Sequence, residues 1–352
     1  MARYVGGFVV VLLLLIAASQ PATAEKSAEQ SFQPASWALS SFWSWITGKT
    51  PPKPVEPKNI PTIDVELIAP AAPKTKDSIA DENLVICTWN IFRFGPSKFS
   101  TPDALHTAGH NVSRMDVMID QIRVCDLVAI QEYMDVSQQA IELLRGNLTE
   151  RTGKPWAKVL SPRVGKPNAE QYVYLYRGDR VVPSMQKLFP DDPVSKLFSR
   201  EPFFTKFTVI NQPNRKLTEF VVGTIHTAPN DAVREISNLV QVFDWAVQQY
   251  STQDVMVLGD YNAGCTYVKA KDWPNIPLRT QSRFTWIVTD DMDTTSMTTH
   301  CAYDRAVYLG EHFRDNYVAD SVEAPHFAAK FGLTPQQAKL VSDHRLVKMD
   351  FC

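Results

Sequence analysis

Four residues that could take part in hydrolytic chemistry each close a short apolar segment of the sequence. They are Asn90, Glu132, His226 and Asp260, which end segments 84–90, 127–132, 220–226 and 254–260. Taken singly, Asn90 could cap a turn, Glu132 could pair with a surface lysine and Asp260 could open a turn. Buried strands that repeatedly carry polar groups at their ends, however, build a shared site. The four residues together therefore predict one site formed by several strand ends.

The side-chain types at these positions indicate metal-assisted hydrolysis of a phosphodiester. Such a reaction needs a divalent cation held by carboxylates, a base for the attacking water and an acid for the leaving oxygen. Glutamate and aspartate oxygens suit Mg²⁺, Mn²⁺ or Ca²⁺. His226, and His344 in Ser342-Asp343-His344, are the histidines whose context suits these proton transfers. Each imidazole would need a carboxylate to orient it. The sequence leaves open which imidazole is the acid and which is the base.

Other chemistries lack their sequence signatures. The cysteines have no CxxC spacing, so a zinc site is not predicted. The chain has no Walker loop, no GxSxG elbow and no GxGxxG fingerprint. Its formal net charge of −2 excludes a protein that coats itself with nucleic acid through charge alone. Action on a nucleic acid would therefore require a local site, a metal, or both.

The elements that would position these residues follow an α/β pattern. The four segments named above and residues 306–309 are apolar runs, as in buried strands. Residues 172–176 and 203–209 alternate as half-buried strands do. A helix is predicted over residues 232–249, whose apolar positions at helical spacing are Ile236, Leu239, Val240, Phe243 and Ala246. We therefore expect one α/β domain over residues 83–352, with sheets sandwiched between helices.

The N-terminal part of the chain is expected to lie outside this domain. Residues 1–24 combine Arg3, an apolar run over 8–16 and the small-residue site Ala22-Thr23-Ala24, which is typical of a cleaved secretory signal; an uncleaved anchor is the alternative. Residues 25–82 are rich in proline, which favours an extended leader. The tryptophan cluster over 37–46 could form a short docking helix or a local packing patch. We expect a secreted or periplasmic monomer with no stable membrane span, whose protein partners stay unknown.

Further motifs occur in order along the chain and form a specific resemblance. They include Asn90-Ile91 with Phe94-Gly95, Ile130-Gln131-Glu132, Arg200-Glu201-Pro202, His226-Thr227-Ala228-Pro229, Gly259-Asp260-Tyr261-Asn262, Cys301-Ala302-Tyr303-Asp304-Arg305 and Ser342-Asp343-His344. The chain resembles the deoxyribonuclease I branch of the endonuclease/exonuclease/phosphatase family over about residues 84–351. This resemblance implies a two-sheet α/β/β/α sandwich that hydrolyses phosphodiester bonds in DNA with the help of a divalent metal.

The resemblance also implies roles for the groups around the scissile phosphate. His226 and His344 would flank the phosphate as acid and base, with Glu170 orienting the first and Asp304 supporting the second. The groups implied to position the phosphate and the metal are Asp260 and Asn262, and Arg200 is implied to contact the phosphate. For Arg200, a solvated surface arginine is the alternative.

Metal ligands are implied in the same way. Glu132 resembles the main ligand for Mg²⁺ or Mn²⁺, with Asn90 beside it, and Asp343 resembles a further metal-binding or structural carboxylate. A structural Ca²⁺ loop is implied by Asp293, Thr295 and Thr299. Met297 replaces an oxygen donor in that loop, and a threonine-rich turn is the alternative.

Among the five cysteines, the resemblance implies a disulfide between Cys265 and Cys301. Cys87 and Cys125 lie at the starts of two strands that should be neighbours, and they could form a second disulfide or remain buried thiols. Because five is an odd number, at least one cysteine, with Cys352 among the candidates, stays without a partner in the chain.

Two departures from the family bear on the substrate. The family reads the minor groove with an arginine and a tyrosine at positions that Met134 and Asn168 occupy here, so preference for single- or double-stranded DNA is left open. One alternative is a phosphodiesterase of the same fold acting on lipid or nucleotide phosphodiesters, or a toxin-type nuclease subunit. Another is a binding protein that keeps the fold without catalysis, against which the intact set of polar residues counts.

Overall fold

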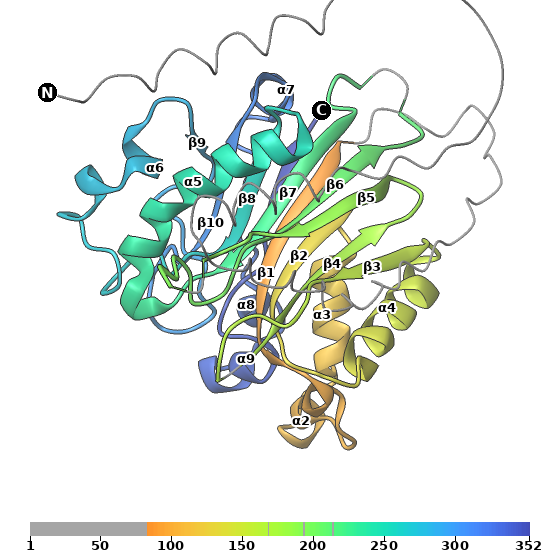
Figure 1. The fold of residues 1–352 in the computed structure, drawn as a ribbon. Coiled ribbons are helices and arrows are strands. Elements are labelled where there is room, and N and C mark those ends of the chain that lie inside the picture. Colours follow the sequence, from red (N-terminus) through yellow and green to blue (C-terminus); the bar gives the residue numbers. More distant parts are fainter. Residues whose placement is uncertain (1–82, 168, 193, 213–214) are drawn as a thin grey trace, which may run out of the picture. The chain divides into compact units, whose positions relative to one another are not determined.

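Two β-sheets carry the site, and the computed structural model describes them within residues 83–167, 169–192, 194–212 and 215–352 (Figure 1). The first sheet has the strand order β11-β1-β2-β4-β3, and the second has the order β5-β6-β7-β8-β10-β9. The strands of the first sheet are β1 (Leu84–Phe94), β2 (Leu127–Tyr133), β3 (Trp156–Leu160), β4 (Gln171–Arg177) and β11 (Val347–Phe351). Those of the second are β5 (Val181–Leu188), β6 (Phe203–Val209), β7 (Glu219–His226), β8 (Val255–Asp260), β9 (Thr285–Trp286) and β10 (Asp304–Leu309).

One parallel pair of strands lies inside each sheet. In β1 and β2, Asn90 is the register partner of Gln131, and in β7 and β8, His226 is the partner of Asp260. Parallel strands are covered on both faces, which explains why their sequences are unbroken apolar runs. Because the strands of each pair run in the same direction, their terminal polar residues come to the same edge of the sheet.

Helices cover the outer face of each sheet (Figure 1). The first sheet packs on α3 (Arg114–Ile122), α4 (Gln139–Thr152), α8 (Phe327–Lys330) and α9 (Pro335–Val341). The second packs on α5 (Ala232–Tyr250) and α6 (Pro277–Thr280). The remaining short helices are α2 (Ala104–Thr107), α7 (Glu311–Asn316) and the 3₁₀ turns η1 (Pro96–Phe99), η2 (Pro229–Asp231) and η3 (Trp273–Asn275).

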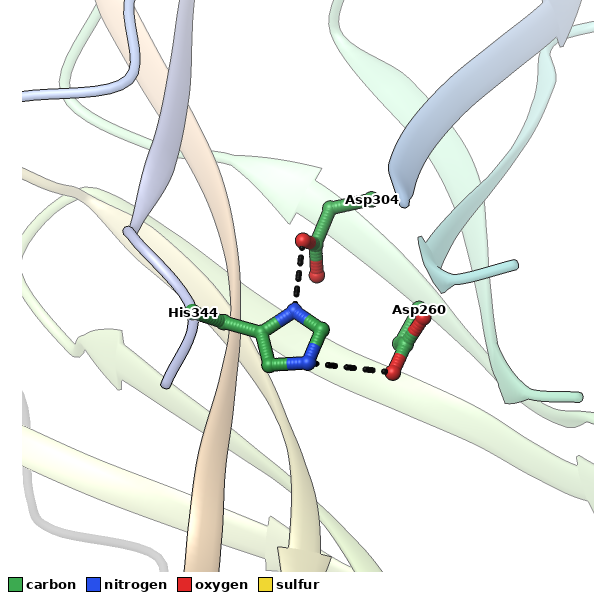
Figure 2. A group of neighbouring side chains, drawn as sticks. All are labelled: Asp260, Asp304 and His344. Atoms are coloured by element: carbon green, nitrogen blue, oxygen red, sulfur yellow. Dashed lines mark hydrogen bonds and ion pairs between the residues drawn. The ribbon is translucent and has the colours of Figure 1, made fainter. Parts of the chain in front are cut away.

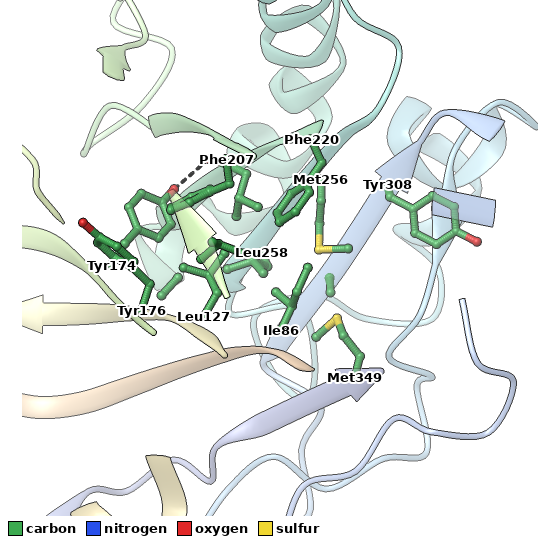
Figure 3. Packing of buried hydrophobic residues seen from close by; sticks show 14 of the residues in the cluster. Ile86, Leu127, Tyr174, Tyr176, Phe207, Phe220, Met256, Leu258, Tyr308 and Met349 are labelled. Atoms are coloured by element: carbon green, nitrogen blue, oxygen red, sulfur yellow. Dashed lines mark hydrogen bonds between the residues drawn. The ribbon is translucent and has the colours of Figure 1, made fainter. Parts of the chain in front are cut away.

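Alternation along the strands divides the apolar side chains among three buried layers. In β1, Ile86 faces the layer between the sheets, whereas Cys87 faces α3 and α4. In β8, Leu258 faces the layer between the sheets, whereas Val257 faces α5. Figure 3 shows the layer between the sheets, where Ile86 and Leu258 pack with aromatic rings such as Phe207. This two-residue period orients each strand, and it therefore fixes where the strand ends lie.

The predicted two-sheet sandwich with helices on its outer faces is confirmed. The helix over 232–249 is present as α5, although Val242 is buried on its inner face and Val240 is only partly buried. Asn90 was expected to end its strand, whereas β1 continues past it to Phe94. Its regular pairing with β2 nevertheless stops at Asn90, where the register shifts, so Asn90 still lies where the two strands diverge.

Two disulfides cross-link the described chain. One joins Cys265 to Cys301, the pair that the resemblance implied, and the other joins Cys87 to Cys125, for which the sequence left two alternatives. Cys352 is exposed and forms no disulfide. The signal segment 1–24 and the leader 25–82 lie outside the described residues. Within those that are described, no helix is long and apolar enough to cross a membrane.

Candidate active site

Asp260 lies between the two histidines at the centre of the site. Its Oδ2 atom is 3.6 Å from Nε2 of His226 and 3.5 Å from Nε2 of His344. The other carboxylate oxygen, Oδ1, accepts a hydrogen bond of 2.9 Å from the backbone N–H of Asn262. Figure 2 shows Asp260 on one side of the His344 ring and Asp304 on the other. A single buried carboxylate thus faces the same ring nitrogen of two imidazoles.

Each imidazole has its own carboxylate partner at the opposite ring nitrogen. Nδ1 of His226 is 2.9 Å from Oε1 of Glu170, and Nδ1 of His344 is 2.8 Å from Oδ2 of Asp304. A carboxylate at Nδ1 accepts the proton there, which leaves Nε2 as the atom that exchanges a proton with a substrate. The structure thus brings together both histidine–carboxylate pairs that the resemblance implied.

These contacts bridge the two sheets. His226 and Asp304 belong to β7 and β10 of the second sheet, while Glu170 and His344 precede β4 and β11 of the first. The amide of Asn90 in β1 also crosses between the sheets, since its Nδ2 donates to Oδ2 of Asp260 at 3.0 Å. The site is consequently assembled only when the two sheets pack together.

Burial and neighbouring charge act in opposite directions on these groups. Burial disfavours charge on His344, but the carboxylates of Asp304 and Asp260 outweigh it and raise the pKa well above the usual 6.5. For His226, burial is likewise outweighed, here by the charge and hydrogen bond of Glu170, and its pKa is raised above 6.5. Burial would raise the pKa of Asp260, yet the two imidazoles lower it below the usual 3.8. The cluster thus favours an ionised carboxylate between two readily protonated rings.

Arg200 lies against the His226 pair rather than in open solvent. Its Nε is 3.2 Å from Oε2 of Glu170, and its Nη1 donates to the backbone oxygen of His226 at 3.1 Å. The Arg200 side chain is 19% exposed, so it can also donate to a bound phosphate. This placement fits the role implied by the resemblance and disfavours a solvated surface arginine.

Glu132 and Asn90 form a pair of oxygen ligands beside the histidines. Oε1 of Glu132 accepts a hydrogen bond of 3.2 Å from Nδ2 of Asn90, and Oε2 accepts one of 2.8 Å from the backbone of Arg93. The Oδ1 atom of Asn90 is buried and has no hydrogen-bond partner. A buried carbonyl oxygen without a donor is costly unless a cation satisfies it. The two residues therefore fit a divalent metal.

Backbone conformation contributes to this ligand pair. Glu132 has a φ of 62°, in the left-handed region that is unfavourable for a residue with a Cβ. The pairing of β2 with both neighbours shifts register around this residue. Such irregularities re-aim a side chain at the end of a strand. Here the irregularity accompanies a glutamate whose carboxylate faces Asn90.

A second group of ligand-type atoms is less suited to a metal. Asp260, Asp304 and His344 offer one such atom each within 4.8 Å of one another. Oδ2 of Asp304, however, already accepts the His344 Nδ1 contact, and Oδ2 of Asp260 faces both imidazoles. A cation held by these Oδ2 atoms would have to displace those contacts, although Oδ1 of Asp304 is buried without a hydrogen-bond partner. Asn90 and Glu132 need no displacement of a histidine contact, so they fit a metal better.

Asp343 and Asn262 occupy the edge of the site in different ways. The Asp343 carboxylate pairs with Lys339 at 3.2 Å and is partly exposed, so its role as a metal ligand stays a prediction. Asn262 is buried, and its Nδ2 donates to the backbone oxygen of Thr227 at 3.1 Å. That bond joins the segments that follow β7 and β8, next to Asp260.

The loop expected to bind Ca²⁺ has protein partners for its ligand-type oxygens. Oδ1 of Asp293 accepts hydrogen bonds from the backbone and hydroxyl of Thr295, at 3.0 and 2.9 Å. The Thr295 hydroxyl has one proton to share between Asp293 Oδ1 and the Thr299 carbonyl, and the contact with the carbonyl is the shorter, at 2.5 Å. Oδ2 of Asp293 forms an ion pair of 2.6 Å with Arg345. Since a guanidinium already neutralises the carboxylate, these residues do not fit a bound calcium ion.

Of the two positions that depart from the family, only Met134 lies within the described residues. Met134 directly follows β2 and is partly exposed, and Asn168 lies outside the described residues. Exposed Arg163 contacts the backbone oxygens of Met134 and Ala169. A cation thus lies between the loops of Glu132 and Glu170, although neither of the usual groove-reading side chains is present.

Sequence reasoning missed residues that hold the site together without touching a substrate. The buried Ser342 hydroxyl donates to the Asn90 carbonyl at 2.6 Å and accepts from the backbone N–H of His344 at 3.1 Å. Buried Glu235 accepts from the backbones of Ser199 and Ala228, at 2.9 and 3.1 Å. For Ser342, the only sequence signal was its position in the Ser-Asp-His triplet. Glu235 had no such signal, because hydrogen bonds to distant backbone leave no sequence pattern.

Comparison with known proteins places this arrangement in a family. The Endonuclease/Exonuclease/phosphatase family profile matches residues 87–344. The chain is 33% identical over 276 residues to deoxyribonuclease-1 of Homo sapiens, which covers 76% of this chain and 92% of that protein. It is 34% identical over 265 residues to deoxyribonuclease gamma of Homo sapiens (74% and 83% covered) and 35% identical over 271 residues to deoxyribonuclease-1-like 2 of Mus musculus (76% and 91% covered).

Solved structures extend the likeness of the fold. An endonuclease/exonuclease/phosphatase from Bacteroides vulgatus has a TM-score of 0.51 at 16% identity, with 77% of this chain and 99% of that one covered. The human Nocturnin catalytic domain has a TM-score of 0.50 at 14% identity, with 77% and 94% covered. At these identities the likeness concerns the fold alone.

Proposed function

The chain belongs to the deoxyribonuclease I branch of the endonuclease/exonuclease/phosphatase family, and we propose that it is a secreted, divalent-metal-dependent endonuclease that hydrolyses DNA phosphodiester bonds. One observation carries the proposal. A buried carboxylate, Asp260, faces Nε2 of both His226 and His344, and each imidazole has a second carboxylate at Nδ1. This arrangement suits two proton transfers on opposite sides of one phosphate.

The two imidazoles would divide the proton transfers of the reaction. With Nδ1 directed to Glu170 or Asp304, each ring exposes Nε2 as the atom that accepts or donates a proton. One Nε2 accepts a proton from the attacking water, and the other donates one to the leaving oxygen. Asp260 stabilises whichever ring carries positive charge during this exchange. The proposal does not assign the two roles to particular histidines.

Asn90 and Glu132 would hold the metal, whose chemistry is to neutralise charge that develops on the phosphoryl oxygens. The support is the unpartnered Oδ1 of Asn90 next to the Glu132 carboxylate. Oxygen ligands favour Mg²⁺ or Mn²⁺, with Ca²⁺ also compatible. Arg200, bound to Glu170 and the His226 backbone, would donate to the phosphate and hold it against the His226 ring.

Secretion is supported by the covalent structure. Disulfides persist in oxidising compartments, and the chain forms two of them. An apolar N-terminal segment with a small-residue cleavage site adds to this support.

Plasmid nicking by the purified protein in Mg²⁺ and Ca²⁺ tests the proposal. We expect nicking that EDTA abolishes and that His226→Ala lowers by about 10²–10⁴-fold, the usual contribution of a general acid or base. The matched control is His312→Ala, because His312 also pairs with an aspartate, Asp254, at 2.7 Å, yet it is half-exposed and is not among the residues of the site. Its nicking rate should equal that of the wild type.

Two outcomes would contradict the proposal. Absence of nicking by a folded, disulfide-intact protein would exclude DNA as the substrate and direct attention to lipid or nucleotide phosphodiesters. Activity that survives His226→Ala would mean that the site is wrongly assigned. Circular dichroism of both variants would show whether a loss of activity comes from the chemistry or from unfolding.

A further inference from the structure

The loop over residues 293–301 contacts the backbone of both Asp304 and His344. The hydroxyl of Thr294 accepts hydrogen bonds of 3.1 Å from the backbone N–H groups of Tyr303 and Asp304. Thr295 forms an isolated antiparallel bridge with His344. Any change in the position of this loop would therefore move both members of the pair.

Asp293 organises this loop through its carboxylate. Oδ1 accepts the backbone and hydroxyl of Thr295 at 3.0 and 2.9 Å, and it also lies 3.3 Å from the backbone N of Cys301. The side chain of Asp293 is only 13% exposed. A carboxylate that is largely removed from water needs a compensating positive charge, and in the implied calcium loop that charge would be a metal ion.

Arg345 supplies that charge from within the chain. Its Nη2 is 2.6 Å from Oδ2 of Asp293, and its Nη1 donates to the Asp293 carbonyl at 3.2 Å. The backbone N–H of Arg345 donates to the Thr294 carbonyl at 2.7 Å. The Arg345 side chain is 12% exposed. Both the carboxylate and the carbonyl of Asp293, which are the oxygen types that calcium prefers, are therefore occupied by one arginine.

We propose that Arg345 is a built-in counter-ion that takes the place of a bound calcium ion in the 293–301 loop. Arginine suits this role because it stays charged and presents a planar fork of donors. A guanidinium that is part of the chain cannot be removed by a chelator. The loop behind His344 therefore keeps its structure without calcium, whatever metal the Asn90–Glu132 pair binds.

Thermal unfolding of the full chain tests this proposal, with wild type, Arg345→Gln, Asp293→Asn and the double variant compared in EGTA. Breaking a largely buried ion pair from one side leaves an uncompensated charge, so we expect each single change to lower Tm by about 5 °C or more. The double variant should lose less than the sum of the two shifts, which would show that the residues are coupled without metal. Added calcium should shift the Tm of wild type and Asp293→Asn equally.

The matched control is Arg283→Gln, which removes an arginine paired with Asp244 where both side chains are more than 40% exposed. Its Tm should change by about 2 °C or less. Should Arg345→Gln fail to fold, Arg345→Lys keeps the charge without the fork, and its Tm should fall between those of wild type and Asp293→Asn.

The proposal is overturned if Arg345→Gln leaves Tm unchanged in EGTA, or if calcium raises the Tm of wild type but not that of Asp293→Asn. Either result would make Arg345 a bystander, and the second would in addition make Asp293 a calcium ligand. Because unfolding uses no DNA, the test stays valid if the nuclease proposal fails.

Discussion

The charges of His226 and His344 depend on carboxylates that are buried with them. Without Glu170, Asp304 and Asp260, burial would keep both rings neutral. With them, each ring can hold a proton at Nε2 in a place from which water is largely excluded. In the proposed reaction, a substrate phosphate would therefore meet imidazoles whose charge is set by the protein rather than by solvent.

This balance predicts how the stability of the metal-free protein depends on pH. The pKa of His344 is raised above its usual 6.5, so the stability it contributes is fully present below pH 6.5 and is lost as the pH rises through the higher folded value. The pKa of Asp260 is lowered below its usual 3.8, so its contribution is present above pH 3.8 and is lost as the pH falls through the lower folded value. The His344 and Asp260 contributions should therefore be present together between these two values, while burial and the Asp260 charge raise the pKa of Asp304, whose own contribution is lost as the pH rises above 3.8.

The measurement is the Tm difference between wild type and His344→Asn in EDTA across the pH range. We expect the Tm difference to be largest near about pH 5 and to shrink in alkaline buffer. The decrease should correspond to at least about 1 kcal/mol in the free energy of unfolding. A difference that grows with rising pH would mean that His344 is neutral in the folded protein.

Residue types at the strand ends made half of this site predictable. Asn90, Glu132, His226 and Asp260 could be read from the apolar segments that precede them. Glu170 and Asp304 came only from the resemblance, because nothing in their immediate sequence marks them as partners of a histidine. The Ser342 hydroxyl bridges Asn90 and His344, residues far apart in the chain, and such a bridge depends on tertiary structure that local sequence does not encode.

At the scale of the elements, close contact between β7 and β8 places His226 next to Asp260. Gly259 in β8 has a φ of +141°, and a Cβ there would lie 2.1 Å from the Ile225 carbonyl oxygen. The strands can approach at this point only because the residue before Asp260 has no side chain.

Gly259→Ala should therefore lower the free energy of unfolding by roughly 3 kcal/mol or more, since it combines a steric clash with an unfavourable φ. The control is Gly146→Ala in α4, where a Cβ would meet nothing within 4 Å. Because alanine favours helix over glycine, this change should raise stability by up to about 1 kcal/mol. Urea unfolding of both variants would measure the contrast, and equal effects would contradict this account of the strand contact.

The strands and helices that are most buried were the ones that the sequence predicted best. The parallel strands β1, β2, β7 and β8 are covered on both faces and were recognised as apolar runs. Strands β3, β5, β9 and β11 escaped prediction because they lie at the edges of the sheets or are very short. Helix α4 buries only Ala140, Ile141, Leu144 and Leu148 among its fourteen residues, which leaves a weak helical periodicity in the sequence.

At the scale of the whole described chain, two covalent bonds support a site that spans two sheets. The Cys87–Cys125 bond joins β1 to the segment before β2, with 38 residues of separation. Sequence could place these cysteines in neighbouring strands, but their pairing depends on distances that only the folded sheet provides.

Replacing both cysteines, as Cys87→Ala with Cys125→Ala, should lower the free energy of unfolding by about 4 kcal/mol, because a loop of this length constrains the unfolded chain to that extent. Cys352→Ala is the control, since Cys352 is exposed and forms no disulfide, and it should leave stability unchanged. Urea unfolding under non-reducing conditions would measure both. No loss in the double variant would mean that the bond does not constrain the unfolded chain.

The pairing of β1 with β11 has a consequence for how a cell makes this protein. Asn90 emerges from the ribosome some 250 residues before His344 and the strand that follows it. Under the proposed function, a nascent chain that lacks His344 therefore has no complete catalytic centre. Until the ribosome has released the last of these segments, the cell's own nucleic acids are exposed only to an inactive polypeptide.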